Sequence, residues 1–309
     1  MLTSVINKNK LENILINPSY VFLPIWLNPH PKYTNYPNVL NDTRYNKDII
    51  CNHLWGSTNN AYIQDYYDKF FYNNYQGVSI LLPVYNENIQ YLQECIESII
   101  SQDFIYIIEL VIVNDGSEIE VQNYLNNLVK LSTQFIRFNI IHLESNKGLV
   151  NALNIGLQNC KYEIVFRMDS DDIMHKDRIK IQYEYFVKNN LNILGCSIEM
   201  FYENNKKPNK IIKHPNTIDK NYLKKKKSLW FVNHPTIVFR KCIILEQGGY
   251  VKSDIPEDFD LWIRLLSKNY IINNISDVLL KYRRTNKNIT KKCLSKHIVS
   301  KMVSRINSL

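Results

Sequence analysis

The hexapeptide RMDSDD, at residues 167–172, places three carboxylates within four positions directly after the apolar run IVF. Asp169 and Asp171 are two residues apart where a strand gives way to a loop, so both side chains can face one ligand. Carboxylate oxygens suit Mg²⁺ or Mn²⁺ and leave open positions on the ion for phosphate oxygens. The alternative is capping of a following helix. Capping explains only one acid, which we expect to be Asp172, so Asp172→Asn should be the mildest of the three single changes.

Asp115, in the turn NDGS, is a second candidate for ligand binding. A carboxylate near a base can accept a hydrogen bond from a ring N–H, which uracil offers and cytosine does not. We therefore expect Asp115 to contact uridine. The alternative is a plain turn, because Asp-Gly is among the commonest turn pairs.

The elements that must position these residues alternate along the chain. Short apolar runs predict strands, and apolar residues at helical spacing predict helices between them. The expected strands lie at 78–82, 110–113, 140–141 and 164–166, and the expected helices run through 92–100, 121–128, 149–157 and 179–187. This alternation is typical of an α/β domain with a mainly parallel sheet. Ligands bind such a sheet at the carboxyl ends of its strands, so the polar turns after the first, second and fourth strands should share one rim.

The two ends of the chain differ from this regular middle part. After about residue 190 the alternation loosens, with strands predicted at 193–202 and 236–239 and a short helix at 260–267. Residues 1–75 are rich in Asn, Tyr and Pro and have broken periodicity, apart from one helix expected within 61–75. We interpret residues 1–75 as an accessory segment.

The composition is that of an ordinary globular protein, with 309 residues of which 45% are hydrophobic and 22% charged. The net charge of +9 favours an anionic partner, although a solvated lysine-rich face is the alternative for the run KKKK at 224–227. The six cysteines include no C-x-x-C pair, which argues against a zinc site or a disulfide framework and favours a reducing cytosol. Neither a membrane span of roughly 18 apolar residues nor a signal peptide is recognisable. We expect a cytoplasmic protein, soluble or peripherally attached to a membrane.

The motifs of the α/β half occur in a recognisable order. PVYNE follows the first strand, NDGS the second and DSDD the fourth, and NKG followed by NIG brackets the start of the helix through 149–157. These match the motifs P-x-Y-N-E, D-D-G-S, D-x-D-D and N-x-G…N-x-G. The chain from 78 to about 202 therefore resembles the nucleotide-binding half of a family 2 glycosyltransferase of the GT-A fold.

The second half agrees with this resemblance. HPT at 234–236, GGY at 248–250 and EDFDLWIRL at 257–265 resemble the family segments H-P-[ST], G-G-Y and E-D-x-D-L-W-x-R-L. The sequence departs from the pattern at Asn114, where Asp is common, and at Thr285, where many relatives have the histidine of Y-R-x-H. A histidine that could meet a metal or a diphosphate is therefore absent.

The resemblance implies the fold class and the domain bounds. The fold would be α/β, with a Rossmann-like nucleotide-binding half, a mixed central sheet and an N-terminal accessory segment. The GT-A domain would span 76–290, divided at 202/203 into a nucleotide-binding half and a half for the acceptor and the catalytic base. Residues 291–309 would form a basic C-terminal tail.

The resemblance also implies the reaction and its residues. A sugar would pass, with inversion, from a nucleotide diphosphate such as UDP-GlcNAc, UDP-Glc or UDP-Gal to a hydroxyl of a glycan, lipid or protein. Asp258 would be the base, with Glu257 supporting it or orienting the acceptor. Asp171 would ligate Mn²⁺ or Mg²⁺, and Asp169 would reach the metal or the ribose. The remaining contacts to the nucleotide sugar would come from Pro83, Tyr85, Glu87, Asp115 and Lys147.

Four residues near the second acidic pair have open roles. His234 could touch acceptor or diphosphate, or could order the loop before Pro235. Arg264 is a candidate contact for acceptor or diphosphate, and Trp262 favours core packing over a sugar platform. Arg283 could draw the diphosphate into place, with surface solvation as the alternative.

Three competing functions remain. A sugar nucleotidyltransferase usually carries a glycine-rich, basic loop after its first strand, whereas PVYNENIQY contains no glycine. A basic protein that binds anionic surfaces or nucleic acid would leave the acidic rim unexplained and repulsive. A catalytically inactive transferase is the third alternative, and the retained carboxylates argue against it. The expected partners are thus the donor and the acceptor, with no nucleic acid.

Overall fold

The computed structural model describes residues 77–203, 207–226, 228–285 and 295–309. The accessory segment expected at 1–75 and its helix lie outside these residues. The chain divides into two compact units, one of Met1–Asn74 with Val187–Asn190 and the other of Tyr75–Phe186 with Leu191–Leu309. The second unit holds the sheet and every candidate site residue.

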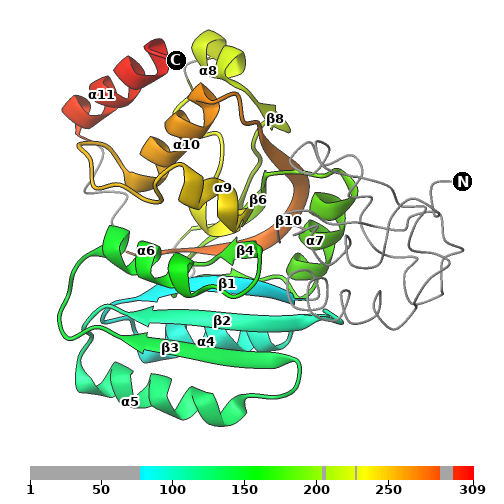
Figure 1. The fold of residues 1–309 in the computed structure, drawn as a ribbon, viewed down its shortest axis with the longest axis vertical. Coiled ribbons are helices and arrows are strands. Elements are labelled where there is room, and N and C mark those ends of the chain that lie inside the picture. Colours follow the sequence, from blue (N-terminus) through cyan, green and yellow to red (C-terminus); the bar gives the residue numbers. More distant parts are fainter. Residues whose placement is uncertain (1–76, 204–206, 227, 286–294) are drawn as a thin grey trace, which may run out of the picture. The chain divides into compact units, whose positions relative to one another are not determined.

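The nucleotide-binding half is built as the sequence predicts. Its strands are β1 (Gly77–Val84), β2 (Ile107–Asn114), β3 (Ile136–His142) and β4 (Ile164–Arg167). Its helices are α4 (Ile89–Ile100), α5 (Ile119–Leu128), α6 (Leu149–Asn159) and α7 (Arg178–Lys188), and a short 3₁₀ turn, η5 (Val129–Leu131), follows α5. The four strands are parallel in the order β3-β2-β1-β4. Figure 1 shows α6 on one face of these strands and α4 on the other.

A glycine sets how closely α6 approaches the sheet. A Cβ on Gly156 would lie 2.2 Å from Cδ1 of Leu81 and 3.0 Å from Cγ2 of Val113. Only glycine permits this contact between the helix and strands β1 and β2. The glycine of NIG is thus explained by packing.

The second half extends the same sheet with strands of mixed direction. They are β5 (Ile173–Met174), β6 (Ile193–Tyr202), β7 (Lys210–Ile212), β8 (Thr217–Ile218), β9 (Val238–Arg240) and β10 (Ile272–Arg284). Within the described residues the sheet runs β3-β2-β1-β4-β9-β6-β10-β5, with β7 on β6 and β8 on β10. Strand β9 is antiparallel to both β4 and β6. The expected mixed central sheet is confirmed.

Helices cover one end of this second half. They are α8 (Lys220–Lys226), α9 (Lys241–Glu246), α10 (Glu257–Ser267) and α11 (Lys296–Asn307), with a 3₁₀ turn, η7 (His234–Thr236), before β9. The strand expected from residue 236 begins at Val238, because HPT forms that turn. Within the tail expected at 291–309, α11 buries Met302 and Ile306 and packs on α8 and α10 (Figure 1). None of the described helices combines the length and the apolar character needed to cross a bilayer.

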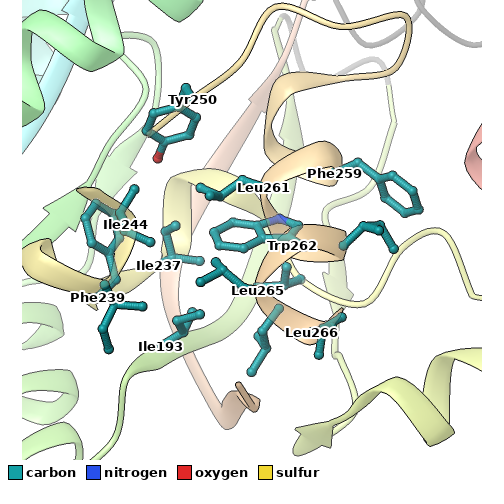
Figure 2. Close-up of a cluster of buried hydrophobic side chains, with 14 of the residues drawn as sticks. Ile193, Ile237, Phe239, Ile244, Tyr250, Phe259, Leu261, Trp262, Leu265 and Leu266 are labelled. Carbon is teal, nitrogen blue, oxygen red and sulfur yellow. The ribbon is translucent and has the colours of Figure 1, made fainter. Parts of the chain in front are cut away.

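The core beneath α10 is apolar and centred on Trp262. This residue is 2% exposed and lies among Ile237, Leu261 and Leu265 (Figure 2). At about 25 cal/mol per Å², such burial is a main source of folding free energy. The expectation that Trp262 serves core packing rather than a sugar platform is confirmed.

Candidate functional site

The rim of the sheet has a point where the strand order changes direction. The chain adds β2 and β3 on one side of β1 and then crosses to add β4 on the other. The loops after β1 and β4 diverge at such a point and leave a crevice for ligands. The turn of Tyr85 and Glu87 and the acidic turn of residues 169–172 follow these two strands, so the predicted rim is present.

Asn86 joins the turns that follow β1 and β2. It adopts a left-handed conformation with φ 45°, which asparagine tolerates better than most residues. Its N–H donates to Oγ of Ser117 at 2.9 Å, and its Oδ1 accepts the N–H of Glu118 at 2.7 Å. Tyr85, beside it, is 50% exposed and available to a ligand, whereas Pro83 is buried within β1.

Asp115 holds the loop that leads into α6. The carboxylate is 3% exposed, and its two oxygens accept the backbone N–H groups of Lys147 at 2.7 Å and of Gly148 at 2.8 Å. Asp115 and Lys147, both predicted to contact the nucleotide sugar, therefore lie side by side and are joined through the backbone N–H of Lys147. Each carboxylate oxygen has a second lone pair, so a contact to a base remains a proposal.

The departure at Asn114 has a physical reason. Its Oδ1 accepts the N–H of Ser117, and its Nδ2 donates to Nδ1 of His142 at 2.9 Å. Nε2 of His142 lies 3.0 Å from Oδ1 of Asn126, which fixes the proton on Nε2 and leaves Nδ1 as an acceptor. An ionised aspartate could not donate to this nitrogen, whereas an asparagine can.

The acidic turn concentrates negative charge. Asp169, Asp171 and Asp172 each offer an oxygen atom, and these atoms lie within 4.8 Å of one another. Burial, then the charges of Asp169 and Glu87, raise the pKa of Asp171 to about 7. Glu87 is held beside the turn, because its Oε2 accepts the hydroxyl of Ser170 at 3.0 Å. The carboxylates of the turn raise one another's pKa, and one buried oxygen of Asp172 has no hydrogen-bond partner among the described residues. Both features fit a divalent cation.

Asp172 does not cap a helix, contrary to the sequence expectation. Helix α7 begins only at Arg178, after β5. Asp172 is fully buried, and its Oδ1 accepts the backbone N–H of Arg283 on β10 at 2.9 Å. Burial, then the charges of Asp169 and Asp171, raise its pKa well above the usual range.

Arg283 fixes the backbone of the acidic turn. Its guanidinium lies between the rings of Tyr91 and Phe201, with centroids 4.1 Å and 4.7 Å away, and pairs with Glu94. Its Nε donates to the carbonyl of Asp171 at 2.7 Å. The residue is 6% exposed, so the alternative of surface solvation is wrong, and a contact to diphosphate stays a proposal.

Arg167 is a site residue that the sequence analysis did not single out. Its Nη2 lies 2.5 Å from Oδ1 of Asp169, and only 2% of the residue is exposed. Its Nε and Nη1 have no hydrogen-bond partner within the described residues. The available signal was its place as the last residue of the fourth strand, where its side chain belongs to the same rim as the acids.

The second acidic pair begins α10 and is strongly perturbed. Burial, then the charge of Asp258, raise the pKa of Glu257 to about 7, and burial raises the pKa of Asp258. Oδ1 of Asp258 accepts the N–H of Phe259 at 2.7 Å. Adjacent acids whose proton affinity is raised towards neutral pH suit proton transfer.

His234 lies beside the second acidic pair. Nε2 of His234 lies 2.9 Å from the hydroxyl of Tyr250, and Nδ1 lies 3.9 Å from Oε1 of Glu257. Burial, then the charge of Arg167, hold the pKa of His234 well below its usual value. The ring is therefore neutral, and its contact with Glu257 is too long for a hydrogen bond and is no ion pair.

Arg264 and Asn154 secure the GGY turn that presents Tyr250. Arg264 pairs with Asp260 at 2.7 Å and donates to the carbonyl of Gly249 at 2.8 Å, so it acts within the fold. Asn154 of α6 donates to the carbonyl of Tyr250 at 2.7 Å and accepts its N–H at 2.8 Å. Gly249 has φ +69°, and a Cβ there would lie 2.5 Å from Oδ1 of Asn154. The family motifs NIG and GGY are thus linked by one contact, in which Asn154 of the first half binds the backbone of Tyr250 in the second half.

Comparison with known proteins assigns this architecture. Residues 79–248 match the model of the family described as "Glycosyl transferase family 2". Among curated proteins, the chain is 35% identical to "O-antigen biosynthesis glycosyltransferase WbnJ" of Escherichia coli, over 71% of this chain and 84% of that protein. It is 30% identical to "UDP-Gal:alpha-D-GlcNAc-diphosphoundecaprenol beta-1,3-galactosyltransferase" of Escherichia coli, over 72% and 80%.

A solved structure supports the fold. The S. aureus TarS 1–349 complex with UDP-GlcNAc matches with a TM-score of 0.59 and 18% identity. The match covers 74% of this chain and 66% of that chain, just under two thirds of it. At this identity the likeness concerns the fold alone, which is that of GT-A glycosyltransferases.

Proposed function

The chain belongs to glycosyl transferase family 2 and is a glycosyltransferase, and we propose that it is an inverting, metal-dependent enzyme that uses a UDP-sugar. The acceptor is a hydroxyl of a glycan or of a lipid-linked glycan. The observation that carries this proposal is a second acidic pair, Glu257 and Asp258, whose pKa is raised by burial and also by the charge of Asp169 in the acidic turn.

The acidic turn would hold the donor. Asp169 and Asp171 would ligate Mn²⁺ or Mg²⁺, whose charge would neutralise the departing diphosphate. Arg283 and Glu87 keep the turn in place, through the carbonyl of Asp171 and the hydroxyl of Ser170.

The nucleoside would lie on the exposed ring of Tyr85, near the turn of Asp115 and Lys147. The names of a curated relative, with UDP-Gal, and of a solved neighbour, with UDP-GlcNAc, support UDP as the carrier. A Mn²⁺ complex of another neighbour of the same fold, a mannosyltransferase from Pyrobaculum calidifontis, supports the use of a divalent cation.

The acceptor would be activated by the second acidic pair. Asp258 would accept the proton of the attacking hydroxyl, and Glu257 would orient that hydroxyl. The pKa of about 7 for Glu257 means that both acids are not fully ionised together near neutral pH, so the pair can exchange a proton. Neutral His234 can orient the acceptor by a hydrogen bond without competing as a cation. Arg264 supports the turn of Tyr250 and would not touch either substrate.

The test is a panel of nucleotide sugars with Mn²⁺, in which released nucleoside diphosphate is measured with and without a chelator. We expect slow hydrolysis of one UDP-sugar and its loss in chelator. GDP-sugar turnover would contradict the assignment of UDP, and release that is unchanged in chelator would contradict the metal. Silence across the panel, with no nucleotide binding by calorimetry, would favour the inactive alternative.

A further inference from the structure

Arg167 is unlike the other buried arginines of the second unit. Arg178 is also fully buried, but it donates to Oε1 of Gln182 and to the carbonyl of Arg167 at 2.9 Å and 3.0 Å. Arg240 donates to the carbonyl of Leu191. Arg167 has one carboxylate partner, and its Nε and Nη1 find none within the described residues. Burying unpaired N–H groups is unfavourable, so hydrogen bonding does not explain why the residue is there.

Its surroundings point to charge instead. Asp169, Asp171 and Asp172 follow Arg167 in the chain, with an oxygen of each within 4.8 Å of the others. The charge of Arg167 also acts on the second acidic pair, where it lowers the pKa of Glu257 and of Asp258. The backbone N–H of Arg167 donates to the carbonyl of Ile237 at 2.9 Å, and Ile237 directly follows η7.

The turn η7 carries this link to the second pair. His234 is in η7, and its Nδ1 lies 3.9 Å from Oε1 of Glu257. Because His234 is neutral, it cannot balance the charge of Glu257 and Asp258. Among the described residues, Arg167 pairs with Asp169, and its charge, which an arginine keeps at physiological pH, also lowers the pKa of Glu257 and of Asp258.

We propose that Arg167 is a positioning residue that acts as a shared counter-ion, holding Asp169 for the donor site and balancing the ionised base pair Glu257–Asp258 of the acceptor site. This inference rests on the proposed function for its catalytic meaning. In this proposal, the side chain of Arg167 couples the donor site to the acceptor site electrostatically.

The proposal has a consequence for binding order. Once a cation and a diphosphate are bound, the Asp169 carboxylate also interacts with the cation. Its negative charge then neutralises less of the positive charge of Arg167. The field of Arg167 then acts more fully on Glu257 and Asp258 and favours their ionised form. Coupling of this kind is reciprocal, so ionisation of the base pair also strengthens donor binding.

The first measurement is Mn²⁺ binding to the full chain, followed by the EPR signal of free Mn²⁺ without nucleotide. In Arg167→Met a positive charge beside the ligand is lost, so Mn²⁺ should bind at least about threefold more tightly than to the wild type. Arg167→Lys keeps the charge and should stay within about twofold. Arg240→Met serves as the matched control for loss of a buried arginine, with unchanged Mn²⁺ affinity.

The second measurement is the pH profile of turnover. Several charged or titratable groups face Glu257 and Asp258 from β4, the acidic turn, η7 and the GGY turn: Arg167, Asp169, His234 and Tyr250. Of these, Arg167 lowers the pKa of both acids. Arg167→Met should therefore move the acidic limb of kcat upward by at least about half a pH unit, and Arg167→Lys should restore it.

Two results would overturn the inference. One is weaker Mn²⁺ binding in Arg167→Met that Arg167→Lys does not restore, which would make Arg167 a scaffold for Asp169. The other is an acidic limb that stays in place in an active Arg167→Met enzyme. If the wild type turns over no nucleotide sugar, the proposed function fails, whereas the Mn²⁺ titration still decides the role of Arg167.

Discussion

The carboxylate of Asp172 accepts the backbone N–H of Arg283 at 2.9 Å, across 111 residues of sequence. Strand β10 thus holds the last acid of the turn, while the Arg283 side chain holds the carbonyl of Asp171. The acidic turn is fixed by strand β10, which lies between β6 and β5 in the sheet, rather than by the helix that follows the turn.

Asp172→Asn should be tolerated, because the amide oxygen can still accept the N–H of Arg283. Burial and the neighbouring acids raise the pKa of the Asp172 carboxyl and so favour its neutral form, which asparagine resembles in charge and shape. We expect a change in the free energy of unfolding below about 1 kcal/mol for Asp172→Asn. For Asp172→Ala, which leaves that N–H unpaired, we expect a loss of about 1–3 kcal/mol. Urea denaturation compares the two, and equal losses would contradict the role of the hydrogen bond.

Asp171→Asn should weaken Mn²⁺ binding at least about tenfold, equivalent to about 1.4 kcal/mol. The carboxylate supplies both charge and a ligand atom, and an amide supplies only the atom. Asp103→Asn is the control, because Asp103 pairs with Lys180 at the surface. Calorimetric titration of both variants should separate them, and similar affinities would remove Asp171 from the metal site.

Asp258→Asn should lower kcat by about 100-fold or more, the usual range for loss of a general base. The dissociation constant of the donor should change less than about twofold, because the proposed role of Asp258 is to act on the acceptor. Asp260→Asn, three helical positions from the start of α10, should mainly lower the melting temperature by freeing Arg264. A donor affinity that collapses in Asp258→Asn would show that Asp258 supports nucleotide binding instead.

Tyr250→Phe should destabilise the protein by about 1 kcal/mol, because a nitrogen of buried His234 loses its hydroxyl partner. A double-mutant cycle with His234→Ala should give a coupling energy of similar size. Additive effects would mean that the contact adds nothing to stability.

The pH dependence of stability follows from the two carboxyl groups whose pKa is about 7, Asp171 and Glu257. Each of these carboxyl groups has a higher pKa in the folded protein than in the unfolded chain. Folding therefore takes up protons at pH values between the unfolded pKa and the folded pKa. Their contribution to stability is complete at acid pH and is lost as the pH rises through about 7. The metal-free protein should therefore melt at a higher temperature at pH 6 than at pH 8. Mn²⁺ should raise the melting temperature more at pH 8, where no proton competes for Asp171, and a larger effect at pH 6 would contradict this.

Much of the fold could be predicted from local patterns. The four parallel strands and their helices follow from the alternation of short apolar runs with helical stripes, and the rim follows from the rule for parallel sheets. The turn at His234 was missed because the apolar residues after Pro235 suggest a strand that begins two residues too early. Pairing of β9 between β4 and β6 depends on contacts far apart in sequence, which periodicity does not encode.

In the site, too, local patterns predicted some features, whereas features that depend on contacts distant in sequence were missed. Clustered acids at the end of a strand predict a cation site, because a divalent ion stabilises carboxylates that would otherwise repel one another. The role of Asp172 was wrongly assigned, because its partner lies on a strand 111 residues away. Arg167 was overlooked because its place at the end of the fourth strand is a weak signal, and its role depends on the carboxylates gathered around it.

Both backbone groups of Tyr250 are bound by the single side chain of Asn154. In evolutionary terms, we expect this contact to restrict recombination between family members. A gene fusion that takes the acceptor half from one enzyme and the nucleotide half from another must inherit a compatible Asn and Gly-Gly-Tyr together. New acceptor preferences should therefore arise by drift in the loops around this junction, and chimaeras that mismatch it should fail to fold.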